Sequence, residues 1–487
     1  MSLRVDKKLA EFLREVRNTS PDQKIYLVGG AVRDLVLGKP VKDLDFVVAD
    51  GSVELAKIVK RRFNGVWYSL DDEHQSARVI LKQGDADELV LDFTAFIGET
   101  LEQDLRQRDF TINAMAIDLD NLEEVIDPLG GQNDLRDGQL CLGNPQSLIS
   151  DPLRVLRAVR MVRTLELSHT DEITENLRVA TKGLNRISGE RIRDELLKCL
   201  ALPNLTLTYE LLKDYGILDH LLQRTSEQES SKKLLADSPG ENLTNIDDDF
   251  EQNFLQTLEK LILYIEKEDP DSSDFDLCPV SISLPDILKK LNKYLGETLQ
   301  GGRTRKQLLI LFAMFFPHYS GYLADNQNEV DSNCLAFAES ITNAFMLGQK
   351  EKQFFELVCA GYWEIFSLDQ EARVSALQIY RYFRRVGSYG VESAVLHLVN
   401  YCASSSLLPE KISIADAIIF TWFREQTKIV DPPRLVDGDD LQKILHLNSG
   451  PELGFYLESI REAQVTGEVK TRDEALAHVT RLIGERK

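Results

Sequence analysis

The stretch IYLVGGAVRDLVLGKPVKDLDFVVAD, residues Ile25–Asp50, decides how the rest of the chain is interpreted. It opens with a short apolar run that ends at Gly29 and Gly30, two residues that permit a tight turn and a close approach of the backbone to a ligand. A short helix over Ala31–Leu37 and a strand over Leu44–Val48 are expected next. The stretch therefore predicts a strand, a glycine turn, a helix and a second strand.

Two carboxylates stand at the start of that second strand. Asp43 and Asp45 are two positions apart, and in a strand such residues point to the same face. Like charges held close together repel each other unless a cation lies between them. Mg²⁺ prefers oxygen ligands, so the pair, together with the glycine turn and Arg33, predicts a metal site beside bound phosphates. For Asp-x-Asp taken alone, an acidic strand end in solvent is the alternative.

The order GG-x-VRD-x-x-LG followed by D-x-D resembles motif A of the class II tRNA nucleotidyltransferase and bacterial poly(A) polymerase family. The matched positions are Gly29, Gly30, Val32, Arg33, Asp34, Leu37, Gly38, Asp43 and Asp45. A Rossmann phosphate loop is the rival interpretation, but Gly-x-Gly-x-x-Gly is absent and the Asp pair has no role there. The resemblance implies that Asp43 and Asp45 are catalytic metal ligands and that the glycines and Arg33 bind the nucleotide.

A third carboxylate, Asp92, lies inside an apolar run, where an unpaired charge is costly. Two strands, Ala77–Leu81 and Glu88–Phe93, are expected here around a GDAD hairpin turn. The Asp92 side chain either points to the surface or joins the two carboxylates of the first stretch. The resemblance favours the second alternative and makes Asp92 the third catalytic carboxylate.

The segment RQRDFTINAMA resembles motif B of the family, RRDFTINAMA, with Gln107 in place of its first arginine. The resemblance implies that Arg108, Asp109 and Asn113 belong to the nucleotide site. A guanidinium such as that of Arg108 grips phosphate oxygens bidentately, and the Asn113 amide can hydrogen-bond a ribose hydroxyl. Without the family, Arg108 and Asp109 would be interpreted as a surface ion pair.

A helix is expected over SDPLRVLRAVRMVRTL, capped by Ser150 or Asp151. Polar side chains recur there every three residues, at Asp151, Arg154, Arg157 and Arg160. A solvated arginine face is one interpretation. The other is the family's EDxxR element, a protein template for incoming CTP and ATP, which this stripe resembles although Ser150 replaces the glutamate. Asp151 and Arg154 would then present an acceptor and donors to a base edge.

The composition sets the class of protein. A chain of 487 residues has room for several domains, and no signal peptide or long apolar run is evident, so no membrane partner is expected. The net charge of −22 argues against a protein that coats nucleic acid indiscriminately. The six cysteines show no Cys-x-x-Cys pattern, which favours free thiols and a cytoplasmic location.

The predicted fold class is α+β, with a small mixed sheet in an N-terminal head and helices thereafter. The expected domains are a catalytic head (1–140), a neck with the base-selecting helix (141–215), a body with acidic mobile connections (216–410) and a tail (411–487). The tail stretch 435–479 resembles a C-terminal signature that, in the family, contacts the elbow of tRNA.

The resemblance implies a template-independent RNA nucleotidyltransferase that adds C, A or both from CTP and ATP to the 3′ end of tRNA, with Mg²⁺ as cofactor and no obligate protein partner. Members that complete CCA carry a long flexible loop between the third carboxylate and motif B. Here only Phe93–Gln107 intervenes, with Leu101–Arg106 expected to be helical, and this favours an enzyme that adds CC. Complete CCA addition, A addition, poly(A) synthesis and a non-catalytic RNA-binding protein are the alternatives.

Overall fold

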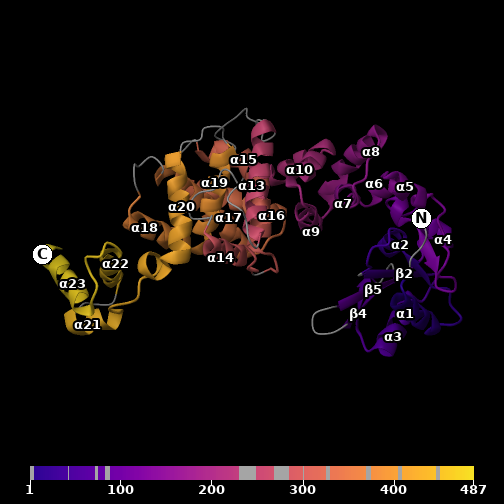
Figure 1. The fold of residues 1–487 in the computed structure, drawn as a ribbon, viewed down its shortest axis with the longest axis horizontal. Helices are drawn as coiled ribbons and strands as arrows, with labels where there is room; N and C mark the ends of the chain where they lie inside the picture. The colour runs from indigo at the N-terminus through magenta and orange to yellow at the C-terminus, as the bar shows by residue number, and fades with distance from the viewer. Residues whose placement is uncertain are drawn as a thin grey trace. The chain divides into compact units, whose positions relative to one another are not determined.

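The computed structural model describes residues 5–41, 43–71, 75–82, 88–229, 248–267, 284–299, 301–324, 330–368, 374–403, 409–445 and 450–486. Contacts divide the chain into two compact units, Met1–Leu202 with Glu210–His220 and Pro203–Tyr209 with Leu221–Lys487. The strands of the described residues belong to the first unit, and the second unit is built of helices (Figure 1). The predicted α+β class is confirmed, whereas the finer division into four domains stays a prediction.

The head contains a mixed sheet of six strands in the order β3-β4-β5-β2-β1-β6. The pair β2 and β5 is parallel and the other neighbours are antiparallel. All four strands predicted from the sequence are present, but β3 and β6 have no counterpart in that prediction, and the GDAD turn lies outside the described residues. The strands are β1 Tyr26–Val28, β2 Asp43–Val48, β3 Val66–Asp71, β4 Ser76–Lys82, β5 Glu88–Ala95 and β6 Ala116–Asp118.

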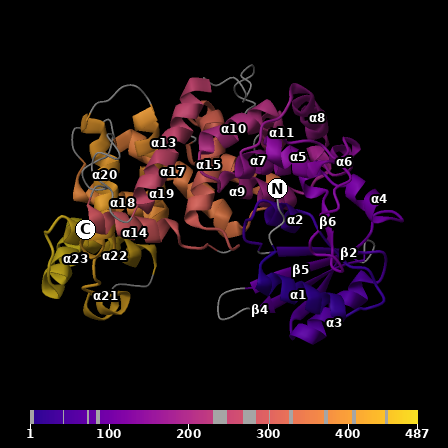
Figure 2. The same cartoon turned by 45° about the vertical axis from the view of Figure 1, so that its right-hand side comes forward.

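The two faces of this sheet differ because alternate side chains of a strand point to opposite sides. On one face Leu44, Phe46, Leu91 and Phe93 are buried, and the rings of Phe46 and Phe93 stack with their centroids 5.0 Å apart. Helices α1 (Lys7–Asn18) and α3 (Ser52–Phe63) lie on this side of the sheet (Figure 2). The opposite face carries the carboxylates and is turned toward the helices that follow the head.

The remaining helices of the first unit place the motifs around that second face. The α4 helix coincides with the predicted range 101–106. The helices and the short 3-10 turn η1 are α2 Gly30–Val36, α4 Leu101–Arg106, η1 Thr111–Asn113, α5 Gly131–Asp137, α6 Gln146–Ser150, α7 Arg154–Leu165, α8 Asp171–Thr181 and α9 Gly189–Leu200. The helices α10 Leu205–Asp214 and α11 Ile217–Ser226 follow.

The predicted start of the neck helix is wrong. The α7 helix begins at Arg154, and neither Ser150 nor Asp151 caps it, because Ser150 ends α6 and donates its hydroxyl to the Ser147 carbonyl. The reason is Pro152, whose ring disfavours helical dihedrals in the preceding residue. Asp151 accordingly has φ −131° and ψ 88°, which separates the two helices.

The second unit consists of helices around an aromatic core. Phe354, Phe355, Tyr362, Tyr380 and Tyr382 are buried in this core. Of the acidic connections expected to be mobile in the body, residues 230–247 and 268–283 lie outside the described residues. The helices are α13 Asp248–Glu266, α14 Pro285–Leu295, α15 Arg305–Ala324, α16 Val330–Ala344, α17 Gln349–Leu368, α18 Ala376–Val386, α19 Gly390–Ala403, α20 Pro409–Arg424, α21 Gly438–Leu445, α22 Pro451–Val465 and α23 Arg472–Arg486.

Two general expectations can be compared with these ranges. Among the described cysteines, Cys141, Cys199, Cys334 and Cys359 carry free thiols. Within the described parts of the chain, no helix has both the length and the apolar character that crossing a membrane requires.

Candidate active site

A row of polar side chains runs across the second face of the sheet, held in register by the backbone ladder. Asp45 on β2 is the register partner of Asp92 on the parallel strand β5. Asp92 in turn is opposite Arg78 on β4, and Arg78 is opposite Tyr68 on β3. The structure thus places Asp92 beside Asp45, as expected from the sequence.

Asp92 is bound by an arginine that the sequence prediction did not single out. The Arg78 Nε and Nη2 atoms each donate to one Asp92 carboxylate oxygen at 2.7 Å, and this pairing raises the pKa of Arg78. The signal was present in the sequence: the two predicted strands form a hairpin in which Arg78 falls opposite Asp92. To predict the pair, one would need the register of the hairpin. The sequence does not determine that register, because it does not reveal the type of the turn.

Burial raises the pKa of the Asp45 carboxyl to about 6, and repulsion from Asp92 acts in the same direction while Arg108 opposes it. Asp43, on the same face of β2, is exposed. Among the described residues, no three His, Cys, Asp or Glu side chains are already gathered as a metal cluster. The donor set nevertheless fits a hard divalent cation, because these carboxylates supply only oxygen and a cation would relieve the repulsion at Asp45.

A cavity of about 670 Å³ opens between this face, the glycine turn and α7. Asp43, Asp92 and Asp151 do not line it. The residues predicted for the site that do line it are Gly29, Gly30, Arg33, Asp45, Arg108, Asp109, Asn113, Arg154, Arg157 and Arg160. The sequence reasoning did not find Phe96, Ile97, Asp104 and Met161, which also line it.

The glycine turn brings two charged side chains into close contact with the backbone at its first residue. Gly29 has φ +74°, and a Cβ atom there would lie 3.3 Å from both the Arg108 Nη1 and the Asp45 Oδ2 atoms. Only glycine combines this backbone conformation with so close an approach of two charged groups. The turn therefore brings its backbone directly to the charged end of the cavity.

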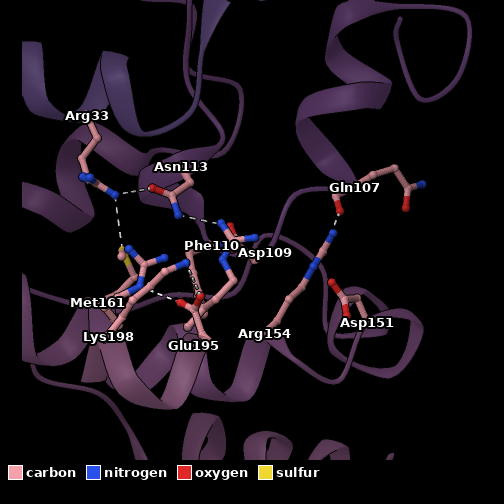
Figure 3. A network of polar contacts seen from close by, with 12 residues as sticks. Arg33, Gln107, Asp109, Phe110, Asn113, Asp151, Arg154, Met161, Glu195 and Lys198 are labelled. Carbon is pink, nitrogen blue, oxygen red and sulfur yellow. Dashed lines mark hydrogen bonds and ion pairs between the residues drawn. The ribbon is translucent and has the colours of Figure 1, made fainter. Parts of the chain in front are cut away.

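A chain of hydrogen bonds connects motif A to motif B and the neck (Figure 3). Arg33 donates through Nη1 to the Asn113 Oδ1 atom at 2.8 Å, and Asn113 donates through Nδ2 to Asp109 at 3.2 Å. The buried Asp109 carboxylate forms an ion pair with Arg157 on α7 at 2.9 Å. Each of these residues is thus oriented by a partner from another motif, which fixes the cavity wall.

Arg154 and Asp151 are oriented differently from each other. Arg154 donates through Nη1 to the Gln107 carbonyl oxygen at 3.1 Å, and its partial burial lowers its pKa (Figure 3). Asp151, outside the helix, instead pairs with Arg191 of α9 at 3.3 Å. The structure brings Arg154 to the cavity wall and leaves Asp151 next to it, held by a second arginine.

The last arginine of the stripe is anchored to α9. Arg160 donates through Nε to Glu195 at 2.7 Å, and Lys198 donates to the other oxygen at 3.1 Å. Burial disfavours the charged form of Glu195, but Arg160 and Lys198 outweigh it and lower the pKa of the carboxyl. Arg154, Arg157 and Arg160 consequently present a positive stripe to a cavity that also contains Asp45.

Three family models match this chain. They are the poly A polymerase head domain over residues 25–141, the probable RNA and SrmB-binding site of polymerase A over 170–228, and a putative tRNA nucleotidyltransferase domain 2 over 349–480. The first match covers the sheet and both motifs, and the third covers the end of the body and most of the tail. The fold and these matches define a metal-dependent nucleotidyltransferase.

Curated relatives and solved structures agree with that class. The chain is 27% identical to the CC-adding tRNA nucleotidyltransferase of Geobacter sulfurreducens, over 94% of this chain and 91% of that protein. It is 28% identical to the A-adding tRNA nucleotidyltransferase of Deinococcus radiodurans, over 93% and 94%. A CCA-adding enzyme solved with CTP has the same fold, with a TM-score of 0.66, 22% identity and 99% of each chain covered. The chain belongs to the class II CCA-adding enzyme family, which confirms the resemblance seen in the sequence.

Proposed function

We propose that this nucleotidyltransferase adds two C residues from CTP to the 3′ end of tRNA and then stops. The observation that carries the proposal is the connection between β5 and α4, which is short and tied down. Phe96 donates its amide to the Val48 carbonyl at 2.9 Å, and the Ile97 amide donates to the Asp104 carboxylate at 3.0 Å. A segment bound in this way does not move freely, so it is not suited to re-shaping the pocket when an enzyme switches from adding C to adding A.

The names of the relatives favour addition of C, but they do not determine which nucleotides this enzyme adds. Two relatives matched along almost the whole chain, from Geobacter sulfurreducens and a Synechocystis strain, are named CC-adding. A multifunctional CCA protein of Neisseria gonorrhoeae is 40% identical over a stretch that covers 40% of this chain. Complete CCA addition is therefore the second candidate, and A addition is the third because of the Deinococcus relative.

The cofactor we propose is Mg²⁺, held by Asp43 and Asp45 with Asp92 beside them. A bound metal ion would supply activation of the primer 3′-hydroxyl and charge stabilisation of the leaving pyrophosphate. The chain's own groups bind and orient the substrates. The glycine turn approaches the triphosphate with its backbone, and Arg33 and Arg108 provide positive charge there.

The base and the sugar are contacted by other parts of the wall. Arg154 presents guanidinium donors to the base edge, with Asp151 as the neighbouring acceptor. In this proposal Asn113, which is held between Arg33 and Asp109, contacts the ribose. The proposed partners are accordingly CTP, ATP and the 3′ end of tRNA, with the tail at its elbow.

We also propose a cytoplasmic location, which the free thiols support.

The experiment is an extension assay on three RNAs, each with CTP and ATP supplied singly and together. A tRNA ending at the discriminator base is expected to grow by two nucleotides, and a tRNA ending in CC is expected to stay unchanged with ATP. An unrelated RNA with ATP tests poly(A) synthesis and is expected to stay unchanged. A product three nucleotides longer that ends in A would contradict CC addition.

A further inference from the structure

The connection between β5 and α4 is held by side chains of α4 itself. Besides the bonds of Phe96 and Ile97, the Glu99 amide donates to the Gln103 side chain at 2.7 Å. Thr100 caps the helix by accepting from the Gln103 amide at 3.2 Å. The backbone of this connection is therefore bonded either to the sheet or to the helix that it precedes.

Asp104 differs from the other groups in this set because it also reaches motif B. Its side chain is buried, with 4% of its surface exposed. One carboxylate oxygen accepts the Ile97 amide at 3.0 Å, and the other accepts the Arg108 Nε and Nη2 atoms at 3.2 and 3.0 Å. A buried carboxylate is tolerated only with such partners, and here both oxygens have one.

Because Asp104 binds the Nε and Nη2 atoms of Arg108, the Nη1 atom remains available to the cavity. The Nε and Nη2 atoms face Asp104, while Nη1 lies near the glycine turn, 3.3 Å from where a Cβ of Gly29 would stand. The Asp45 Oδ2 atom also lies 3.3 Å from the position that a Cβ of Gly29 would occupy. The planar fork of an arginine fixes the direction of its third nitrogen once two of its donors are engaged.

We propose that Asp104 is a positioning residue for nucleotide binding: it aims Arg108 at the triphosphate and fixes the connection above the cavity. The inference rests on the proposed function, because it needs Arg108 to meet a nucleotide. Without Asp104, the guanidinium would lose its anchor and would also be drawn toward Asp45. Nucleotide binding would then carry the cost of ordering a mobile arginine.

The alternative role for Asp104 is purely structural, as a stabiliser of α4. The same helix offers a matched control in Glu102, which receives Arg106 Nε and Nη2 at 3.0 and 2.7 Å. This pair has the same sequence separation of four residues, but its side chains are 61% and 53% exposed and do not line the cavity. Glu102→Gln therefore removes a similar ion pair without touching the nucleotide site.

The experiment compares Asp104→Asn, Asp104→Ala and Glu102→Gln with the wild type in three measurements. CTP binding is titrated by calorimetry with Mg²⁺, melting is followed by circular dichroism, and hydrogen exchange is measured for the peptide spanning the connection. Asp104→Asn keeps one uncharged acceptor oxygen, so it cannot serve the Ile97 amide and Arg108 at the same time as the carboxylate does. Asp104→Ala removes both interactions.

We expect both Asp104 variants to bind CTP about tenfold more weakly, since Arg108 loses the charged acceptor that orients its guanidinium. Faster exchange at the connection is expected for Asp104→Ala, with Glu102→Gln like the wild type in binding and exchange. If Asp104→Ala does not fold, Asp104→Asn carries the test. Equal CTP affinities of wild type and Asp104→Asn, or equal losses in Asp104→Asn and Glu102→Gln, would overturn the inference. A wild type that binds CTP but does not extend tRNA contradicts the proposed function alone.

Discussion

At the scale of single residues, the site combines groups whose charges oppose one another. Asp45 lies in a cavity whose wall also contains five arginines, yet burial and Asp92 still raise its pKa to about 6. Asp92 is neutralised by Arg78 rather than by the cavity arginines. The carboxylates are therefore unequal: Asp92 is paired with Arg78, whereas Asp45 is buried with its pKa raised.

Asp45→Ala is expected to abolish nucleotidyl transfer while the protein stays folded. Loss of a proposed metal ligand should lower the rate by about 10³-fold or more. Removal of a carboxylate that burial and Asp92 disfavour should leave the metal-free melting temperature equal or higher. The measurement is single-turnover extension in Mg²⁺ together with a melting curve. Near-normal turnover would contradict the proposed metal site.

Arg154→Ala is expected to weaken discrimination among the four nucleotides. A good contact from an arginine to a base edge is worth about 1–3 kcal/mol, so selectivity for CTP should fall by up to that amount. Arg163→Ala, on the same helix but outside the cavity wall, serves as the control. Competition between CTP and each other nucleotide measures the effect. Equal slowing for all nucleotides, with selectivity unchanged, would show that Arg154 is structural.

Glu195→Gln is expected to lower the free energy of unfolding at neutral pH by about 1.5–3 kcal/mol, because Arg160 and Lys198 lose a charged acceptor. The folded protein holds the pKa of Glu195 below its ordinary value of 4.5. The stability from this charge is therefore present above that value and disappears as pH falls through the lowered pKa. Denaturant unfolding at several pH values should show the two proteins converging in acid, whereas exposed Glu190→Gln should match the wild type throughout.

At the scale of elements, the turn between β1 and α2 fixes the distance between backbone and charged groups. Gly29→Ala is expected to cost about 1–3 kcal/mol of stability and most of the nucleotide affinity, because its Cβ would meet Arg108 and Asp45. Gly38→Ala is the control: its φ is +66°, with nothing within 4 Å of the added atom. It should cost stability and keep affinity. A Gly29→Ala protein that binds CTP normally would contradict the close approach.

The elements were predictable where the sequence is periodic. The strands β1, β2, β4 and β5 show apolar runs or alternation, and α4 has a threonine cap. The edge strand β3 is mostly exposed on both faces, so it has no alternation to detect. The start of α7 was missed because Pro152 was interpreted as a first-turn residue, although it also restricts the residue before it.

The site was predictable in its residue types and less so in its pairings. Motifs A and B and the arginine stripe of the neck gave many of the residues that line the cavity, since each pattern is local in the chain. Arg78 and Asp104 were not found, because their partners depend on strand register and on which helix face is buried. The pairing of Asp151 with Arg191 joins the residue after α6 to a residue of α9, 40 positions further on, which local spacing cannot show.

At the scale of the whole molecule, the two units have separate cores and separate buried ion pairs. In the second unit, Glu392 is fully buried and accepts from Arg305 at 2.6 Å and from the Tyr294 hydroxyl at 2.8 Å. The cavity, by contrast, belongs wholly to the first unit. Damage to the second unit should therefore spare nucleotide binding.

Glu392→Ala is expected to destabilise the second unit by about 3–5 kcal/mol, since it leaves the Arg305 charge buried without its partner. Trp363 and Trp422 both belong to that unit, so tryptophan fluorescence reports mainly on its unfolding. CTP affinity should match the wild type below the new melting temperature. Glu425→Ala, which removes an exposed pair with Lys428, should change neither quantity. A parallel loss of CTP binding would contradict independent units.

The row from Tyr68 through Arg78 and Asp92 to Asp45 also bears on how such an enzyme can change over evolution. A strand can shift against its neighbour only by whole residues, and a shift by one turns every side chain to the other face. Small adjustments of the carboxylate row are therefore not accessible by mutation. A helix such as α7 and a connection such as the one before α4 can move by fractions of a residue. New nucleotide preferences should thus accumulate in these two elements, while the strands stay as they are.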